Sequence, residues 1–172
     1  MVSCVSVSES LRSPRSRWGV PLFRAISVGM SNPTVISPKE AHDKMADGVP
    51  YVDVRTVEEF EEGHPVGAVN VPLMMRGPSG MVSNPQFLSV MVSRFPREAP
   101  LVVGCKAGGR SQRAARLLAD AGFAAVFDQG AGWDGSRDAF GRLVEPGWAR
   151  QGLPSEPGQP SGRSWADLAE KD

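Results

Sequence analysis

Short apolar segments alternate with amphipathic segments along most of the chain. Five stretches rich in β-branched and aromatic residues are typical of buried strands: 34–36, 49–54, 68–71, 100–104 and 123–127. Helical features lie between them, in residues 37–47, 56–62, 84–95 and 111–120. Strands that alternate with helices predict an α/β fold with a mostly parallel central sheet and helices on both faces.

Three of the helix starts have recognisable capping residues. Residues 37–40 and 56–59 each place a glutamate three positions after a hydroxyl N-cap, which is the spacing of a capping box. Asn84 followed by Pro85 predicts a third helix that begins there and ends near Phe95. Periodicity predicts the core-facing positions of the last two helices: Phe87, Leu88, Met91 and Val92, and Ala114, Ala115, Leu117 and Leu118.

The remaining segments set the expected domain boundaries. Glycine, proline and serine in 73–83, and weak patterning in 130–147, predict surface loops. We expect one domain over residues 31–154, with an inserted loop near 134–147. Residues 155–172 are expected to form a tail that docks at most a short helix near Trp165.

Residues 1–30 differ in composition from the rest of the chain. They hold four arginines, one acidic residue and seven serines without apolar periodicity, so their net charge is +3 against −3 for the remainder. This composition is typical of a chloroplast or mitochondrial transit peptide. The interpretation that we favour is nevertheless that Met30 is the true start and that the protein is cytoplasmic, with the transit peptide as the alternative. A secretory signal peptide is disfavoured, because no apolar run of the required length follows the arginines.

Composition excludes several classes of protein. Hydrophobic residues make up 41% and charged residues 22% of the chain, as in ordinary globular domains. Nineteen basic residues balance nineteen acidic ones, so no overall field favours nucleic acid or an anionic membrane. No apolar run approaches membrane-spanning length. Two cysteines and two histidines provide neither a disulfide framework nor a metal cluster, and we expect no metal and no cofactor.

The candidate chemistry lies at Cys105. This cysteine ends an apolar strand just before a helix, which places its sulfur at the carboxyl edge of the predicted sheet, where sites of such folds lie. Gly108 and Gly109 let the backbone curl so that its amides converge on the sulfur. Helix N-terminal amides and the cations of Lys106 and Arg110 favour the thiolate over the thiol. The expected persulfide-stabilising or substrate-binding loop is therefore Lys106, Ala107, Gly108, Gly109, Arg110 and Ser111.

The chain resembles the single-domain rhodaneses, the thiosulfate sulfurtransferases. The segment CKAGGRS at 105–111 is similar to the active-site loop of that family. Further similar segments follow in the family's order: VDVR at 52–55, EEF at 58–60, GH at 63–64, GAVNVP at 67–72, and a closing segment from Trp148 through GLP at 152–154. The resemblance covers about residues 33–154. Pro65 lies one position earlier than is usual, and only some members have a counterpart of the insertion.

The resemblance implies a rhodanese-like three-layer sandwich and a monomeric sulfurtransferase. Cys105 would take sulfane sulfur from thiosulfate or a related small donor and pass it, as a persulfide, to cyanide or a thiol. Lys106 and Arg110 would balance the charge of the donor, or Arg110 would instead pair with a carboxylate. Asp53 and Arg55 would help to bind the donor, or would form a structural ion pair.

Three other functions stay open. One is a sulfur-relay protein whose Cys105 receives persulfide from a partner such as a cysteine desulfurase. Another is an arsenate reductase or phosphatase of the same fold, although their loops have five residues between cysteine and arginine where this chain has four. The last is a non-catalytic regulatory domain, which the retained cysteine and cations disfavour.

Overall fold

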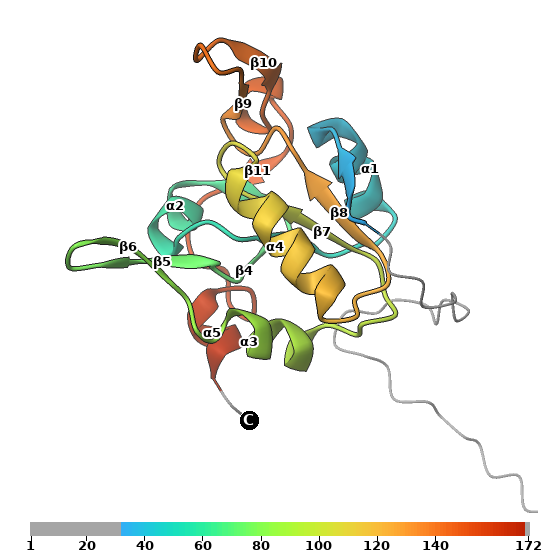
Figure 1. The fold of residues 1–172 in the computed structure, drawn as a ribbon, viewed down its shortest axis with the longest axis vertical. Coiled ribbons are helices and arrows are strands. Elements are labelled where there is room, and N and C mark those ends of the chain that lie inside the picture. Colours follow the sequence, from blue (N-terminus) through green and yellow to red (C-terminus); the bar gives the residue numbers. More distant parts are fainter. Residues whose placement is uncertain (1–31, 171–172) are drawn as a thin grey trace, which may run out of the picture.

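The computed structural model describes residues 32–170, and its centre is one five-stranded sheet (Figure 1). The strand order is β1-β8-β7-β2-β4, and every pairing within this sheet is parallel. Its strands are β1 (Thr34–Ile36), β2 (Tyr51–Asp53), β4 (Val69–Asn70), β7 (Leu101–Gly104) and β8 (Val126–Gln129). The carboxyl ends of these strands therefore share one edge, where β7 occupies the central position.

Helices cover both faces of the sheet. On one face, α1 (Pro38–Ala46) and α2 (Val57–Glu62) bury Ala41 and Phe60 in a cluster with Trp148. On the other face, three helices enclose a larger apolar cluster: α3 (Phe87–Arg94), α4 (Gly109–Asp120) and α5 (Trp165–Ala169). Alternate residues of β7 serve the two clusters, since Val103 faces the larger and Val102 the smaller. The predicted three-layer α/β fold is confirmed.

Local sequence determines the starts of α1 and α2 but not that of α3. Both predicted capping boxes are formed, at residues 37–40 and 56–59. The third predicted start is wrong, because α3 begins only at Phe87. The Asn84 amide group instead donates to the Pro72 carbonyl at 2.7 Å, and its oxygen accepts from the Gln86 amide. Asn84 thus ties a turn to the preceding segment.

Two predicted loops are hairpins. Residues 73–83 contain the antiparallel strands β5 (Met74–Gly77) and β6 (Gly80–Ser83), because the turn-forming residues are confined to the few positions between them. Within 130–147, β9 (Gly135–Arg137) pairs with β10 (Leu143–Pro146). Figure 1 shows both hairpins projecting from the body of the molecule. The strand expected at 123–127 lies at 126–129 instead.

The buried faces of α3 and α4 are narrower than expected. Phe87, Val90 and Met91 are buried on α3, whereas Leu88 and Val92 are exposed. On α4, Ala114, Ala115 and Leu118 are buried and Leu117 is 44% exposed. The exposed residues lie at the flanks of each apolar stripe, where the sheet does not reach.

Residues after 154, expected to be a tail, add structure to the domain. A 3₁₀ turn (Ala149–Gln151) leads to β11 (Ser155–Glu156), which pairs antiparallel with β3 (His64–Pro65). Leu168 on α5 is 3% exposed within the larger cluster, and its carbonyl accepts from Arg94 Nε at 3.0 Å. The packed region therefore extends beyond the boundary expected from the sequence.

Some expectations lie outside the described residues. These are the transit peptide and the alternative start at Met30, both of which concern residues 1–30. Within residues 32–170, no helix has the length and apolar character needed to cross a bilayer.

Candidate active site

Cys105 lies where β7 ends and the loop to α4 begins. The residue is 2% exposed, and its sulfur accepts a hydrogen bond from the Gly108 amide at 3.2 Å. The thiol lies 3.5 Å from Ser111 Oγ, to which it donates, and the Ser111 hydroxyl donates to the Gly108 carbonyl at 3.1 Å. The loop thus folds back over the sulfur and presents the Gly108 amide to it.

The turn at residues 130–134 holds the loop from the other side. Amides of Trp133 and Asp134 donate to the carbonyls of Cys105 and Lys106 at 2.7 and 2.9 Å. Gly108 has φ +94°, and a Cβ there would overlap the Gly130 carbonyl oxygen. Gly109, the first residue of α4, faces open space. The sequence predicted that both glycines are needed for the curl of the loop, whereas the structure requires glycine only at position 108.

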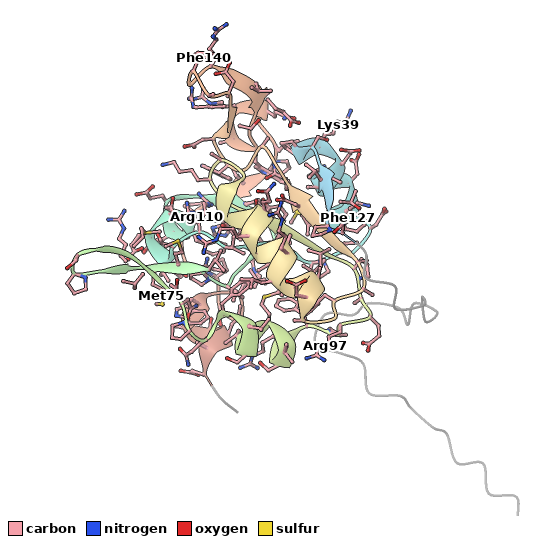
Figure 2. All side chains as sticks on the ribbon, viewed as in Figure 1. Lys39, Met75, Arg97, Arg110, Phe127 and Phe140 are labelled. Atoms are coloured by element: carbon pink, nitrogen blue, oxygen red, sulfur yellow. The ribbon has the colours of Figure 1, made fainter. Side chains whose placement is uncertain are left out.

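Arg110 forms an ion pair with a carboxylate, which is one of the two roles expected for it. Its guanidinium donates to both carboxylate oxygens of Glu59 on α2, at 2.6 and 2.8 Å. Burial opposes ionisation of Glu59, but hydrogen bonds from Arg110 and from the Thr56 backbone outweigh it and lower the pKa of Glu59 to about 2. Figure 2 labels Arg110 at the end of α4 nearest α2.

Lys106 is the more accessible cation of the loop. Its side chain is 56% exposed, and its ammonium group lies 3.6 Å from the carboxylate of Asp134. An exposed ion pair of this kind contributes little to stability, so Lys106 is free to exchange Asp134 for another anion. Ala107 is exposed beside it.

Asp53 and Arg55 form a buried ion pair, with Nη2 2.6 Å from Oδ2. The two side chains are 2% and 4% exposed, and Arg55 also donates to the Gly63 carbonyl at 2.6 Å. The Arg55 guanidinium lies over the ring of Trp133, the residue whose amide holds Cys105. This geometry corresponds to the second role expected for Asp53 and Arg55, a structural ion pair, which here lies behind the loop of Cys105.

Two neighbours of the loop were not singled out from the sequence. The sequence places Glu59 in a capping box and in the EEF segment that resembles the family, but does not indicate that it binds Arg110. Asp128 on β8 is 3% exposed. Its interaction with Ser111 lowers its pKa, against the larger effect of burial, which raises it. No local signal marks either partnership, because the paired residues lie far apart in the sequence. Residues 32–170 contain no group of three side chains suited to hold a metal ion.

Comparison with known proteins agrees with this geometry. The model of the rhodanese-like domain matches residues 37–138, more than half of the chain. The chain belongs to the rhodanese family. This rhodanese is 43% identical over 124 residues to thiosulfate sulfurtransferase 16, chloroplastic, of Arabidopsis thaliana. The aligned residues cover 72% of this chain and 93% of that protein. It is a rhodanese-like transferase, and the family resemblance stated from its motifs is confirmed.

Two further relatives extend the comparison. Rhodanese-like domain-containing protein 15, chloroplastic, of A. thaliana is 42% identical over 101 residues, 59% of this chain and 56% of that protein. Among solved structures, Rv0390 from M. tuberculosis superposes with a TM-score of 0.61 at 31% identity, covering 74% of this chain and all of that one. The first relative is named for its rhodanese-like domain, and the second is a solved structure that shares the fold of this chain.

Proposed function

We propose that this rhodanese transfers sulfane sulfur from thiosulfate, or a related donor, to a thiophilic acceptor through a persulfide on Cys105. The observation that carries the proposal is the contact between the Gly108 amide and the Cys105 sulfur, 3.2 Å long, inside a loop with a fixed backbone. An amide in that position stabilises negative charge on the sulfur, because it is already oriented before the reaction.

The first half of the reaction forms the persulfide. The Cys105 thiolate attacks the outer sulfur of thiosulfate, a new S–S bond forms, and the S–S bond of the donor breaks. Sulfite leaves with the electron pair of that bond. Lys106 is the exposed cation that meets the anionic donor, whereas Arg110 stays with Glu59 and keeps the loop in shape.

The second half returns the enzyme to its starting state. Cyanide, or the thiolate of an acceptor, attacks the outer sulfur of the persulfide and takes it as thiocyanate or a new persulfide. The bond between the two sulfurs breaks, and its electrons return to Cys105 as the thiolate. Cys105 leaves this half of the reaction as the thiolate, so successive turnovers require no separate general base.

Replacing the proposed nucleophile tests this mechanism. We expect Cys105→Ser to abolish thiosulfate:cyanide transfer and to keep the circular dichroism spectrum, because serine is nearly the same size but holds no persulfide. Cys4→Ser, the variant of the other cysteine in the sequence, is the matched control and should keep full activity. Transfer by Cys105→Ser would refute the proposal. Weak thiosulfate turnover with rapid transfer from a protein persulfide would instead favour the relay function.

We also propose that residues 1–30 direct the protein to an organelle, and that the enzyme is a monomer. Two relatives are named chloroplastic, and the arginine- and serine-rich composition of residues 1–30 is typical of transit peptides. A fusion of residues 1–30 to a fluorescent protein should enter chloroplasts or mitochondria. Cytoplasmic fluorescence would favour the start at Met30, and size-exclusion chromatography of the purified chain tests the monomer.

A further inference from the structure

Asp128 is a buried carboxyl group beside the site that the mechanism above does not use. It is 3% exposed on β8, and its Oδ1 atom has no hydrogen-bond partner among the described residues. β8 pairs with β7 so that Asp128 lies opposite Val103, two residues before Cys105. A buried polar atom without a partner costs free energy, which calls for a physical reason at this position.

Ser111 lies between Asp128 and Cys105. Its side chain is completely buried and interacts with the carboxyl group of Asp128. Its Oγ atom is 3.5 Å from the Cys105 sulfur. A serine hydroxyl has a single proton, which here goes to the Gly108 carbonyl, so the sulfur receives no hydrogen bond from Ser111 while the thiol keeps its proton.

We propose that Asp128 is a positioning residue: in its neutral form it donates a hydrogen bond to Ser111 Oγ, and the Ser111 hydroxyl then turns to donate to the Cys105 thiolate. This inference rests on the proposed role of Cys105 as the nucleophile. The thiolate would then receive two hydrogen bonds, one from the Gly108 amide and one from Ser111. No bond is broken except hydrogen bonds, and each group keeps its own proton.

The surroundings of Asp128 favour its neutral form. Burial raises the pKa of Asp128, and the interactions with Ser111 and with the cation of Arg116 on α4 oppose that rise without cancelling it. Cys105 lies beyond Ser111, and Tyr51 on β2 belongs to the cluster on the opposite face of the sheet. The pKa of Tyr51 is raised chiefly by burial and also by the charges of Asp53, Cys105 and Asp128. Once Asp128 ionises, it accepts from Ser111 instead and draws the hydroxyl proton away from the sulfur.

Two matched substitutions of Asp128 distinguish a neutral hydrogen-bond donor from a side chain that only fills space. In the full chain carrying Cys4→Ser, alkylation of Cys105 by iodoacetamide is measured from pH 5 to pH 9. Asp128→Asn keeps a donor that cannot ionise and should react at least as fast as the parent. Asp128→Leu has a similar size but no donor and should react about tenfold more slowly, which is the scale of one hydrogen bond to a charged group.

The pH profile gives a readout that a structural role would not move. The rate of the parent divided by that of Asp128→Asn should fall as pH rises, because only the parent loses its donor. Because this ratio is measured without the leucine variant, it tests the proposal even if Asp128→Leu does not fold. A ratio that stays constant with pH, or an asparagine variant as slow as the leucine variant, would overturn the proposal.

Ser111→Ala removes the link between the two groups. In that background, Asp128→Asn and Asp128→Leu should alkylate at equal rates, and a persisting difference would show that Asp128 does not act through Ser111. Alkylation does not depend on sulfur transfer. A Cys105→Ser protein that still transfers sulfur would therefore refute the proposed function, whereas the alkylation series alone decides the role of Asp128.

Discussion

Gly108 and Gly109 are neighbours in the loop, but the fold makes different demands on them. Gly108 has a positive φ and packs against the Gly130 carbonyl, which leaves no room for a side chain. Gly109 begins α4 with no atom near the position of a Cβ. The two residues therefore provide a matched pair of substitutions one position apart.

We expect Gly108→Ala to lose at least nine-tenths of the sulfurtransferase activity. Alanine costs about 1–2 kcal/mol in the left-handed region, and the overlap with Gly130 must in addition push the loop and its amide away from the sulfur. Gly109→Ala should keep the activity, with an unchanged or slightly higher melting temperature. The thiosulfate:cyanide assay and thermal unfolding measure both effects. Equal losses in the two variants would contradict this account of the loop.

Local hydrogen bonds explain which elements could be predicted from the sequence. The capping boxes at 37–40 and 56–59 involve residues three positions apart, and both helices begin where predicted. Asn84 has the same appearance in the sequence, but its amide group is bound to Pro72, twelve residues away. The hairpin strands within 73–83 were missed because their turn residues dominated the pattern.

The same distinction applies to the candidate site. Cys105 and its loop could be predicted because they are contiguous and the strand before them is strongly apolar. Glu59 and Trp133 are 51 and 28 positions from the residues they hold, as follows from the pairs Glu59–Arg110 and Trp133–Cys105. A single sequence carries no signal for contacts of that kind, which depend on strand order.

The helix α5 shows how much the C-terminal segment contributes. Leu168→Ala removes a buried side chain from the larger cluster, and we expect it to lower the free energy of unfolding by about 2–4 kcal/mol. Leu117→Ala, on the exposed flank of α4, should change it by less than about 0.5 kcal/mol. Urea unfolding at pH 7 measures both. Two equally small losses would mean that α5 does not stabilise the domain.

Acid should destabilise the whole molecule in two ranges of pH. Burial lowers the pKa of His64, although the hydrogen bond with the Phe60 carbonyl partly opposes that shift. As pH falls, the unfolded chain therefore takes up a proton on this histidine before the native protein does. That contribution is present above about pH 6.5 and is lost as pH falls below it. Glu59, with a pKa of about 2, contributes stability that is present above 4.5 and is lost as pH falls from 4.5 toward 2.

Urea unfolding between pH 3 and pH 8 tests both ranges. We expect the free energy of unfolding to decrease as pH falls below about 6.5, less the opposing contribution of Asp128, whose raised pKa stabilises the native state as pH falls, and to decrease again below pH 4.5. In Glu59→Gln the lower decrease should be smaller, because glutamine has no charge to lose, while the decrease near pH 6 should persist. A curve for Glu59→Gln that runs parallel to that of the parent protein below pH 4.5 would show that the Glu59–Arg110 pair does not couple stability to pH.

The ion pairs around Cys105 also determine how the enzyme meets its substrate from a distance. Lys106 is paired with Asp134 and Arg110 with Glu59, so the four formal charges of these two ion pairs sum to zero. Such a site exerts little long-range attraction on a dianion such as thiosulfate. We therefore expect kcat/KM for thiosulfate to vary less than about twofold between 20 and 300 mM salt, although screening over that range is substantial. Asp134→Asn would leave Lys106 uncompensated, and its kcat/KM should rise at low salt and converge on that of the parent at high salt.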